Sequence, residues 1–379
     1  MTCGFCLQTP QSRARRRRCA EGARVLEVCG LAGMMFADGR RVNGEPIMRA
    51  MANMRDRGNG LGGGFAAYGI YPEHKDAYAF HIMYYSSAAK DEVDALLDAY
   101  FDVLRSEPIP TDRSVVLPQS PQLLWRYFLA PSERAMQALS VDSVEEMVID
   151  VVMRINTRPA RDAFVFSSGK NMGAFKAVGY PEDVGRFYRL EEYEAYMWTG
   201  HSRFPTNTQG WWGGAHPFTL LDWSVVHNGE ISSYGINKRY LEMFGYRCAL
   251  KTDTEVMAYL LDLLIRRHGL SIEDACDVMA APFWKDLDRT QDEKRRTLRM
   301  VYASALVNGP FAIVFAHSRG MVGFNDRVKL RPMVAATKGD ALYLASEEAA
   351  ILELCESPDR VWTPRAGQPV IGWLKDGVA

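Results

Sequence analysis

Cys29 begins the stretch that most constrains how this chain folds. The run Cys29-Gly30-Leu31-Ala32-Gly33 predicts the start of a buried strand, with the thiol at the leading end of that strand. Its glycines allow backbone or substrate to approach closely. A single cysteine is most often a small buried hydrophobic residue, so this run indicates a reactive site only together with other segments.

Three polar segments downstream of Cys29 supply that combination. They are residues 200–207 (GHSRFPTN), 227–230 (HNGE) and 252–255 (TDTE). Taken in this order behind the cysteine, they resemble the glutaminase domain of class II glutamine amidotransferases, whose nucleophile is an N-terminal cysteine. The resemblance spans residues 29–350 with one insertion, and we expect the domain to occupy residues 29–379. It implies an α+β fold, the four-layer αββα sandwich of the N-terminal nucleophile hydrolases.

Composition narrows the class of protein further. The chain has 379 residues, 47% of them hydrophobic, which is enough to bury a large core. A net charge of −1 argues against nucleic acid or anionic lipid as the main partner. No apolar stretch approaches the ~20 residues that span a bilayer. Seven scattered cysteines are typical of reduced thiols, so we expect a soluble cytoplasmic protein.

Residues 1–28 do not resemble part of the fold. They carry a run of arginines at 15–18, which is typical of a solvated, disordered tail. Cys3 and Cys6 have half of a zinc-binding spacing without a second half, so we predict no metal site. Two origins stay open for this segment, a propeptide or a non-native extension. The second fits a start at Val28, because GTG encodes valine and initiates some bacterial genes.

Residues 74–170 form the expected insertion. The predicted order of elements is β-α-β-β-α-β, which is that of a ferredoxin-like subdomain. The elements are Tyr78–Tyr85, Lys90–Leu104, Ser114–Leu117, Leu123–Leu129, Val144–Ile155 and Ala163–Ser167. We expect this subdomain to have a structural role or to dock a partner.

The resemblance implies roles for the reacting residues. Cys29 attacks the γ-carboxamide carbon of glutamine, and its own α-amine is the general base once the residues before it are removed. The side-chain amide of Asn228 and the backbone N–H of Gly229 form the oxyanion hole. Asn-Gly is also typical of a two-residue hairpin turn, and the sequence leaves both interpretations open.

The resemblance also implies the residues that hold the substrate. Arg203 binds the α-carboxylate through its forked guanidinium, although a surface ion pair is an equal alternative. Asp253 accepts hydrogen bonds from the α-ammonium, although Thr252 and Glu255 also predict a capping box at the start of a helix from Asp253 to His268. Thr206 resembles a threonine that lines the glutamine site.

Three further residues near these segments are expected to be structural. His216 and His227 are predicted to be satisfied buried histidines, because the N-terminal amine already supplies the base. Arg57 is predicted to support the nucleophile from a neighbouring turn.

The expected partner follows from what comes after the fold. The last strands expected are a hairpin, Phe311–Ala316 and Met321–Phe324, followed by Ala341–Ala345. About 30 residues remain after them, far fewer than the ~100–150 of a synthase domain. We therefore expect the ammonia acceptor on a separate synthase subunit. The nearest resemblance is to the free-standing glutaminase subunit of archaeal-type glutamate synthase, with FMN and iron–sulfur clusters on partner subunits and no cofactor on this chain. Alternatives are the glutaminase subunit of N-methylglutamate synthase, another N-terminal nucleophile amidase, or a non-catalytic regulatory subunit.

Overall fold

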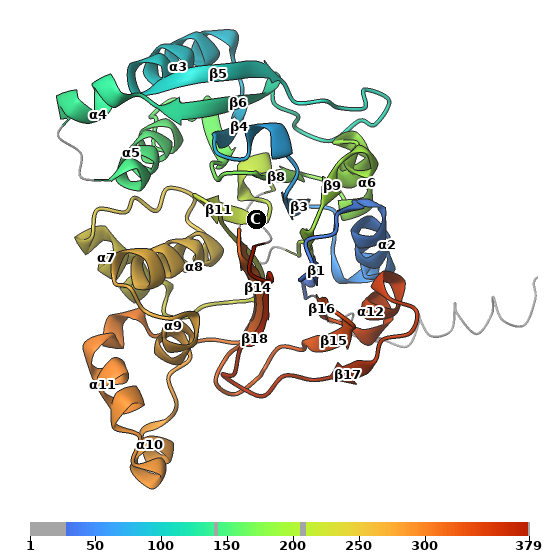
Figure 1. The fold of residues 1–379 in the computed structure, drawn as a ribbon, viewed down its shortest axis with the longest axis vertical. Coiled ribbons are helices and arrows are strands. Elements are labelled where there is room, and N and C mark those ends of the chain that lie inside the picture. The colour runs from blue at the N-terminus through green and yellow to red at the C-terminus, as the bar shows by residue number, and fades with distance from the viewer. Residues whose placement is uncertain (1–27, 140–142, 205–209, 378–379) are drawn as a thin grey trace, which may run out of the picture.

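The computed structural model describes residues 28–139, 143–204 and 210–377. Their strands form two stacked sheets of seven and five strands, a separate four-stranded sheet and a two-stranded pair (Figure 1). Helices cover the outer faces of the two stacked sheets, so the order of layers is helix, sheet, sheet, helix. The two stacked, antiparallel sheets that the sequence predicts are therefore present. Of the segment 1–28, all but Val28 lies outside the described residues.

The seven-stranded sheet contains the strand that follows Cys29. Its order is β17 (Arg360–Trp362), β15 (Val334–Lys338), β16 (Ala341–Ala345), β1 (Gly30–Phe36), β10 (Met197–Ser202), β3 (Gly63–Tyr68) and β8 (Met172–Ala177). β1 and β10 are antiparallel, and Gly30 pairs with Ser202. This register places Cys29, at the leading end of β1, beside Arg203, which directly follows β10.

The five-stranded sheet faces β1 across the centre of the molecule (Figure 1). Its order is β11 (Phe218–Leu220), β12 (Trp223–Gly229), β13 (Phe311–His317), β14 (Gly320–Asn325) and β18 (Val370–Trp373). The predicted β13–β14 hairpin is confirmed by the pairing of these two strands. Asn228 and Gly229 pair with Ala312 and Phe311, so they extend β12 and do not form a two-residue hairpin turn.

Apolar side chains fill the space between the two sheets. Leu31 of β1 and Val226 of β12 belong to one buried cluster there, together with Val314 and Met321. Gly33 lies on the same strand as Leu31, and a Cβ at this position would lie 2.7 Å from the sulfur of Met321. The close approach of the sheets therefore depends on a residue without a side chain.

The helices fall into two groups. The seven-stranded sheet is covered by α2 (Glu45–Asn53), α6 (Pro181–Phe187) and α12 (Glu348–Leu354), and β2 (Val42–Asn43) pairs with β9 (Glu194–Ala195) nearby. The five-stranded sheet is covered by α8 (Asp253–Leu261), against which α7 (Tyr234–Met243) packs. Below them lie α9 (Ile272–Met279), α10 (Trp284–Thr290) and α11 (Glu293–Val301) (Figure 1). Among the described helices, none combines the length and apolar character that crossing a bilayer requires.

Helix α8 begins as the sequence predicts. The hydroxyl of Thr252 accepts a hydrogen bond from the N–H of Glu255 at 3.2 Å. The Glu255 carboxylate does not return to Thr252; it accepts instead from the N–H groups of Ala249 and Leu250. The predicted helix to His268 is α-helical only to Leu261 and continues as a π-helical turn over Asp262–Arg267.

The four-stranded sheet lies at the top of Figure 1. Its order is β5 (Phe101–Pro108), β6 (Leu123–Pro131), β4 (Tyr78–Tyr84) and β7 (Ala163–Ser167), with neighbours antiparallel. The helices of this unit are α3 (Ser87–Tyr100), α4 (Glu133–Leu139) and α5 (Val144–Asn156).

Two predicted elements of this unit are wrong. The helix expected to reach Leu104 ends at Tyr100, and the strand expected at 114–117 is absent. Strand β5 takes its place, because residues from Phe101 onward pair with β6. The helical spacing between Tyr100 and Leu104 is coincidental, since the Leu104 side chain is 57% exposed.

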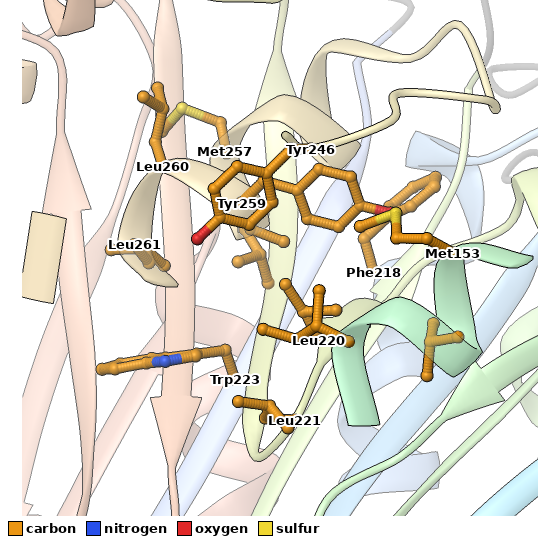
Figure 2. Close-up of a cluster of buried hydrophobic side chains, with 14 of the residues drawn as sticks. Met153, Phe218, Leu220, Leu221, Trp223, Tyr246, Met257, Tyr259, Leu260 and Leu261 are labelled. Atoms are coloured by element: carbon orange, nitrogen blue, oxygen red, sulfur yellow. The ribbon is translucent and has the colours of Figure 1, made fainter. Parts of the chain in front are cut away.

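Figure 2 shows how the four-stranded unit joins the rest of the molecule. Met153 of α5 lies with Phe218 and Leu220 of β11 and with Met257 and Leu260 of α8 in one buried cluster. The unit therefore shares its apolar core with β11 of the five-stranded sheet and with α8, the helix that covers this sheet. That helix also carries Asp253, so the shared core is close in sequence to a predicted site residue.

Candidate active site

Cys29 is held from two sides. Its sulfur accepts a hydrogen bond from the N–H of Phe204 at 3.3 Å, and its carbonyl oxygen accepts one from Nε of Arg57 at 3.1 Å. Arg57 also pairs with Glu347 at 2.6 Å, which fixes the guanidinium. Burial raises the pKa of the Cys29 thiol, and the Phe204 N–H and the Arg203 charge offset only part of this rise. Arg57 thus contacts the backbone of Cys29, the position predicted for a supporting residue.

Asn228 and Gly229 end strand β12 opposite the thiol. The Asn228 side chain is fully buried, and neither its oxygen nor its nitrogen has a hydrogen-bond partner among the described residues. A buried polar group without a partner destabilises the fold by about 1–3 kcal/mol, so the presence of a buried amide at this position calls for an explanation. Gly229 has φ +149°, and a Cβ there would lie 2.0 Å from the carbonyl oxygen of Pro310. This position requires glycine.

Arg203 and Asp253 place opposite charges around the same space. Arg203 is 6% exposed, and its backbone N–H donates to the carbonyl of Gly62 at 2.8 Å. Burial lowers the pKa of its guanidinium from a very high ordinary value, so the group stays cationic. Burial alone would raise the pKa of the Asp253 carboxyl, but His227 and the N–H of Ile231 outweigh it and the pKa is lowered. Asp253 is therefore ionised.

One cavity of about 250 Å³ brings the predicted residues together. Cys29, Arg203, Asn228, Gly229 and Asp253 all line it. They come from the ends of three strands and the first turn of a helix. The sixth predicted residue, Thr206, lies outside the described residues.

Three histidines form a cluster beside the cavity, and two of them, His216 and His227, line it. The rings of His201 and His216 are stacked with centroids 3.8 Å apart, and His201 Nε2 donates to the carbonyl of His227 at 2.7 Å. His216 and His227 both contact the hydroxyl of Thr254, at 2.9 and 3.1 Å. Burial lowers the pKa of His201 to about 3 and that of His216 well below its usual range, so both are neutral at pH 7. These contacts fit the structural role expected of His216 and His227, although each ring has one nitrogen without a described hydrogen-bond partner.

Several residues of the cavity were missed by the sequence analysis. Lys251, Thr254, Tyr234 and Arg331 line it as well. Thr254 could have been found from its place beside Asp253 in the first turn of the predicted helix. Arg331 has no predicted site residue beside it in the sequence, because the chain folds back through β13 and β14 before it reaches the cavity.

Within the described ranges, no group of three or more His, Cys, Asp or Glu side chains is arranged to hold a metal ion.

Comparisons with known proteins identify the family of this chain. Residues 147–362 match the family described as glutamine amidotransferases class-II. Because that range is more than half of the chain, the protein belongs to the class II glutamine amidotransferases. The matched range contains Arg203, Asn228, Gly229, Asp253 and Arg331.

Individual relatives and solved structures match most of this chain at different levels of identity. An uncharacterized protein of Archaeoglobus fulgidus is 54% identical over 92% of this chain and 93% of its own length. The glutamine amidotransferase-like protein GlxB of Rhizobium meliloti is 25% identical over 89% of this chain and 95% of its own. Among solved structures, a glutamine phosphoribosylpyrophosphate amidotransferase of B. subtilis matches 90% of this chain and 47% of that one, with 16% identity and a TM-score of 0.46.

Proposed function

We propose that this protein is a glutaminase that hydrolyses glutamine to glutamate and ammonia, with Cys29 as the nucleophile. The observation that carries the proposal is the convergence of three features on one cavity. These are the Cys29 thiol, the buried and unpartnered amide of Asn228, and the opposite charges of Arg203 and Asp253. A free α-amino acid with a carboxamide side chain matches all three.

The proposed reaction assigns one task to each group. Arg203 binds the α-carboxylate and Asp253 binds the α-ammonium, which fixes the γ-carboxamide beside the sulfur. Sulfur attacks the γ-carbon, and the Asn228 amide and the Gly229 N–H stabilise the oxyanion that forms. Ammonia then leaves, and water hydrolyses the resulting thioester to release glutamate. Thr206 would line the same site.

The general base in this proposal is the α-amine of Cys29. An α-amine has a pKa near 8, so at neutral pH a fraction can take the thiol proton and pass it to the leaving nitrogen. In the chain described here that nitrogen is in a peptide bond with Val28, which itself lines the cavity. The mechanism therefore requires cleavage before Cys29, whether residues 1–28 are a propeptide or a non-native extension.

The ammonia would pass to a separate synthase subunit. The resemblance that favours glutamate synthase would place FMN and iron–sulfur clusters on the partner subunits. The order β5-β6-β4-β7 with helices between its strands supports reading the four-stranded unit as a ferredoxin-like insertion. We propose its outer surface as the docking site for the synthase.

Two protein forms test the glutaminase proposal. One begins at Met1 and the other is produced with Cys29 as its first residue, and each is incubated with glutamine while glutamate and ammonia are measured. We expect equimolar products from the second form and none from its Cys29→Ser variant. Turnover by a form shown by intact mass to retain residues 1–28 would contradict the role of the α-amine. Absence of turnover from the Cys29 form, alone and with proteins that co-purify from the host, would contradict the proposal.

A further inference from the structure

Arg331 reaches the cavity from a loop that is held by buried polar side chains. The loop follows β14, and Asp326 fixes it: its carboxylate accepts from the N–H groups of Phe311, Val328 and Leu330 at 2.9–3.1 Å. Asn325 then donates from Nδ2 to the carbonyl oxygen of Arg331 at 2.9 Å. Asn325 and Asp326 are 0% and 3% exposed, so the position of Arg331 is built into the fold.

Arg331 is half-buried, and the Nε end of its guanidinium is withdrawn from water. Its Nε is buried without a hydrogen-bond partner, and no described carboxylate lies within ion-pair distance of it. Desolvating a cation without a counter-charge is costly. A negative charge that forms near Arg331 during function would offset this desolvation cost, which explains why an arginine is present here.

Other charged groups also surround the thiol of Cys29. Arg203, Asp253 and Arg331 all act on the sulfur of Cys29, the two cations lowering the thiol pKa and the carboxylate raising it. Glu230, Tyr234, Lys251, His216 and His227 line the same cavity. Arg203 and Asp253 form a complementary pair for an amino acid, whereas none of the ion pairs between described residues includes Arg331.

We propose that Arg331 is a further active-site residue, a cation that stabilises negative charge on the Cys29 sulfur. A thiolate is the nucleophilic form of cysteine, and a nearby cation increases its population in a buried site. The inference deepens the proposed function, since it concerns the same site. Its test does not require glutamine turnover, so the two can fail separately.

The test is the pH dependence of alkylation of Cys29 by iodoacetamide, with the modified peptide quantified by mass spectrometry. Arg331→Gln is expected to slow alkylation at pH 7 by about threefold or more and to move the profile to higher pH. Arg331→Lys keeps the charge and should restore most of the rate. Lys329→Gln, on the same loop but outside the cavity lining, is the matched control and should leave the profile unchanged.

Two results would overturn the inference. One is an alkylation profile of Arg331→Gln that coincides with the profile of the protein without substitutions, while thermal unfolding shows that the variant is folded. The other is an Arg331→Lys variant as slow as Arg331→Gln, which would mean that packing and not charge is responsible. If Arg331→Gln does not fold, Asn325→Ser replaces it; loss of the bond to the Arg331 carbonyl should shift the profile in the same direction, and no shift would contradict the role.

Discussion

The Nε atom of Arg57 donates a hydrogen bond to the carbonyl oxygen of Cys29 over 3.1 Å, and this bond ties the backbone of Cys29 to the segment after α2. The guanidinium is held in turn by Glu347, close to α12. The orientation of Cys29 therefore depends on groups that need not contact any substrate.

Replacing Arg57 with Ala should reduce glutaminase activity without changing which residues contact glutamine. The charge-assisted bond to the Cys29 carbonyl contributes about 1.5–3 kcal/mol, and its loss lets the thiol move. We expect a lower kcat with little change in KM, measured by ammonia release. Arg55→Ala is the control, because Arg55 pairs with Glu182 at the surface; an equal effect of both changes would contradict the assignment.

Asn228→Ala should lower activity while the fold keeps or gains stability. The amide has no hydrogen bond to lose among the described residues, so its removal relieves an unfavourable burial. Losing an oxyanion donor lowers kcat by about 10²–10³-fold. Steady-state kinetics and urea unfolding of the same preparation provide both readouts. A large loss of stability would show that Asn228 has a structural role instead.

Arg203→Lys should mainly change KM for glutamine, whereas Asn228→Ala should mainly change kcat. Lysine keeps the positive charge but cannot make the forked contact with a carboxylate. Because that contact exists before the reaction begins, we expect KM for glutamine to rise strongly and kcat to change less. A fall in kcat alone would place Arg203 with the reacting groups and not with the substrate carboxylate.

Gly229→Ala should abolish activity and destabilise the protein. A methyl group would collide with the carbonyl of Pro310 at 2.0 Å, and the backbone has a positive φ. Gly235→Ala is the matched control, since a Cβ there lies no closer than 3.7 Å to any neighbour and the residue is in α7. We expect the control to gain about 0.5–1 kcal/mol in thermal unfolding experiments. Similar losses at both positions would contradict the steric argument.

Glu255 should make stability depend on pH. Burial raises the pKa of its carboxyl from 4.5 to about 7. Its stabilising contribution is complete below about pH 4.5 and is lost as the pH rises toward 7, by about 3 kcal/mol. His201 and His216 titrate in the opposite direction, so the informative quantity is the difference in urea-unfolding free energy between the protein and Glu255→Gln.

That difference should change across pH 4.5–7, because glutamine cannot titrate. The exposed Glu273, replaced in the same way, serves as the control and should give a constant difference. Parallel pH profiles for the unmodified protein and Glu255→Gln would show that this carboxyl has an ordinary pKa.

The sequence predicts local features of this fold better than the contacts between distant segments. The cap at Thr252 and the β13–β14 hairpin depend on neighbouring residues and were predicted. Strand β5 was not, because its pairing with β6 overrides the helical spacing that Leu104 happens to continue. Arg331 was missed for a related reason, since only the return of β14 brings it to the cavity. The convergence of Cys29 and Arg203 depends on the register of β1 and β10, which only the assembled sheet defines.

The two halves of the site belong to different sheets: Cys29 and Arg203 to one, and Asn228 and Gly229 to the other. The distance between the sulfur and these two residues therefore depends on the spacing of the sheets, and Leu31, Val226 and Met321 fill the space between them. The turnover rate should therefore depend on the spacing between the two sheets. Hydrostatic pressure, or a shortened side chain in that layer, should alter the rate at conditions where the fold still resists unfolding.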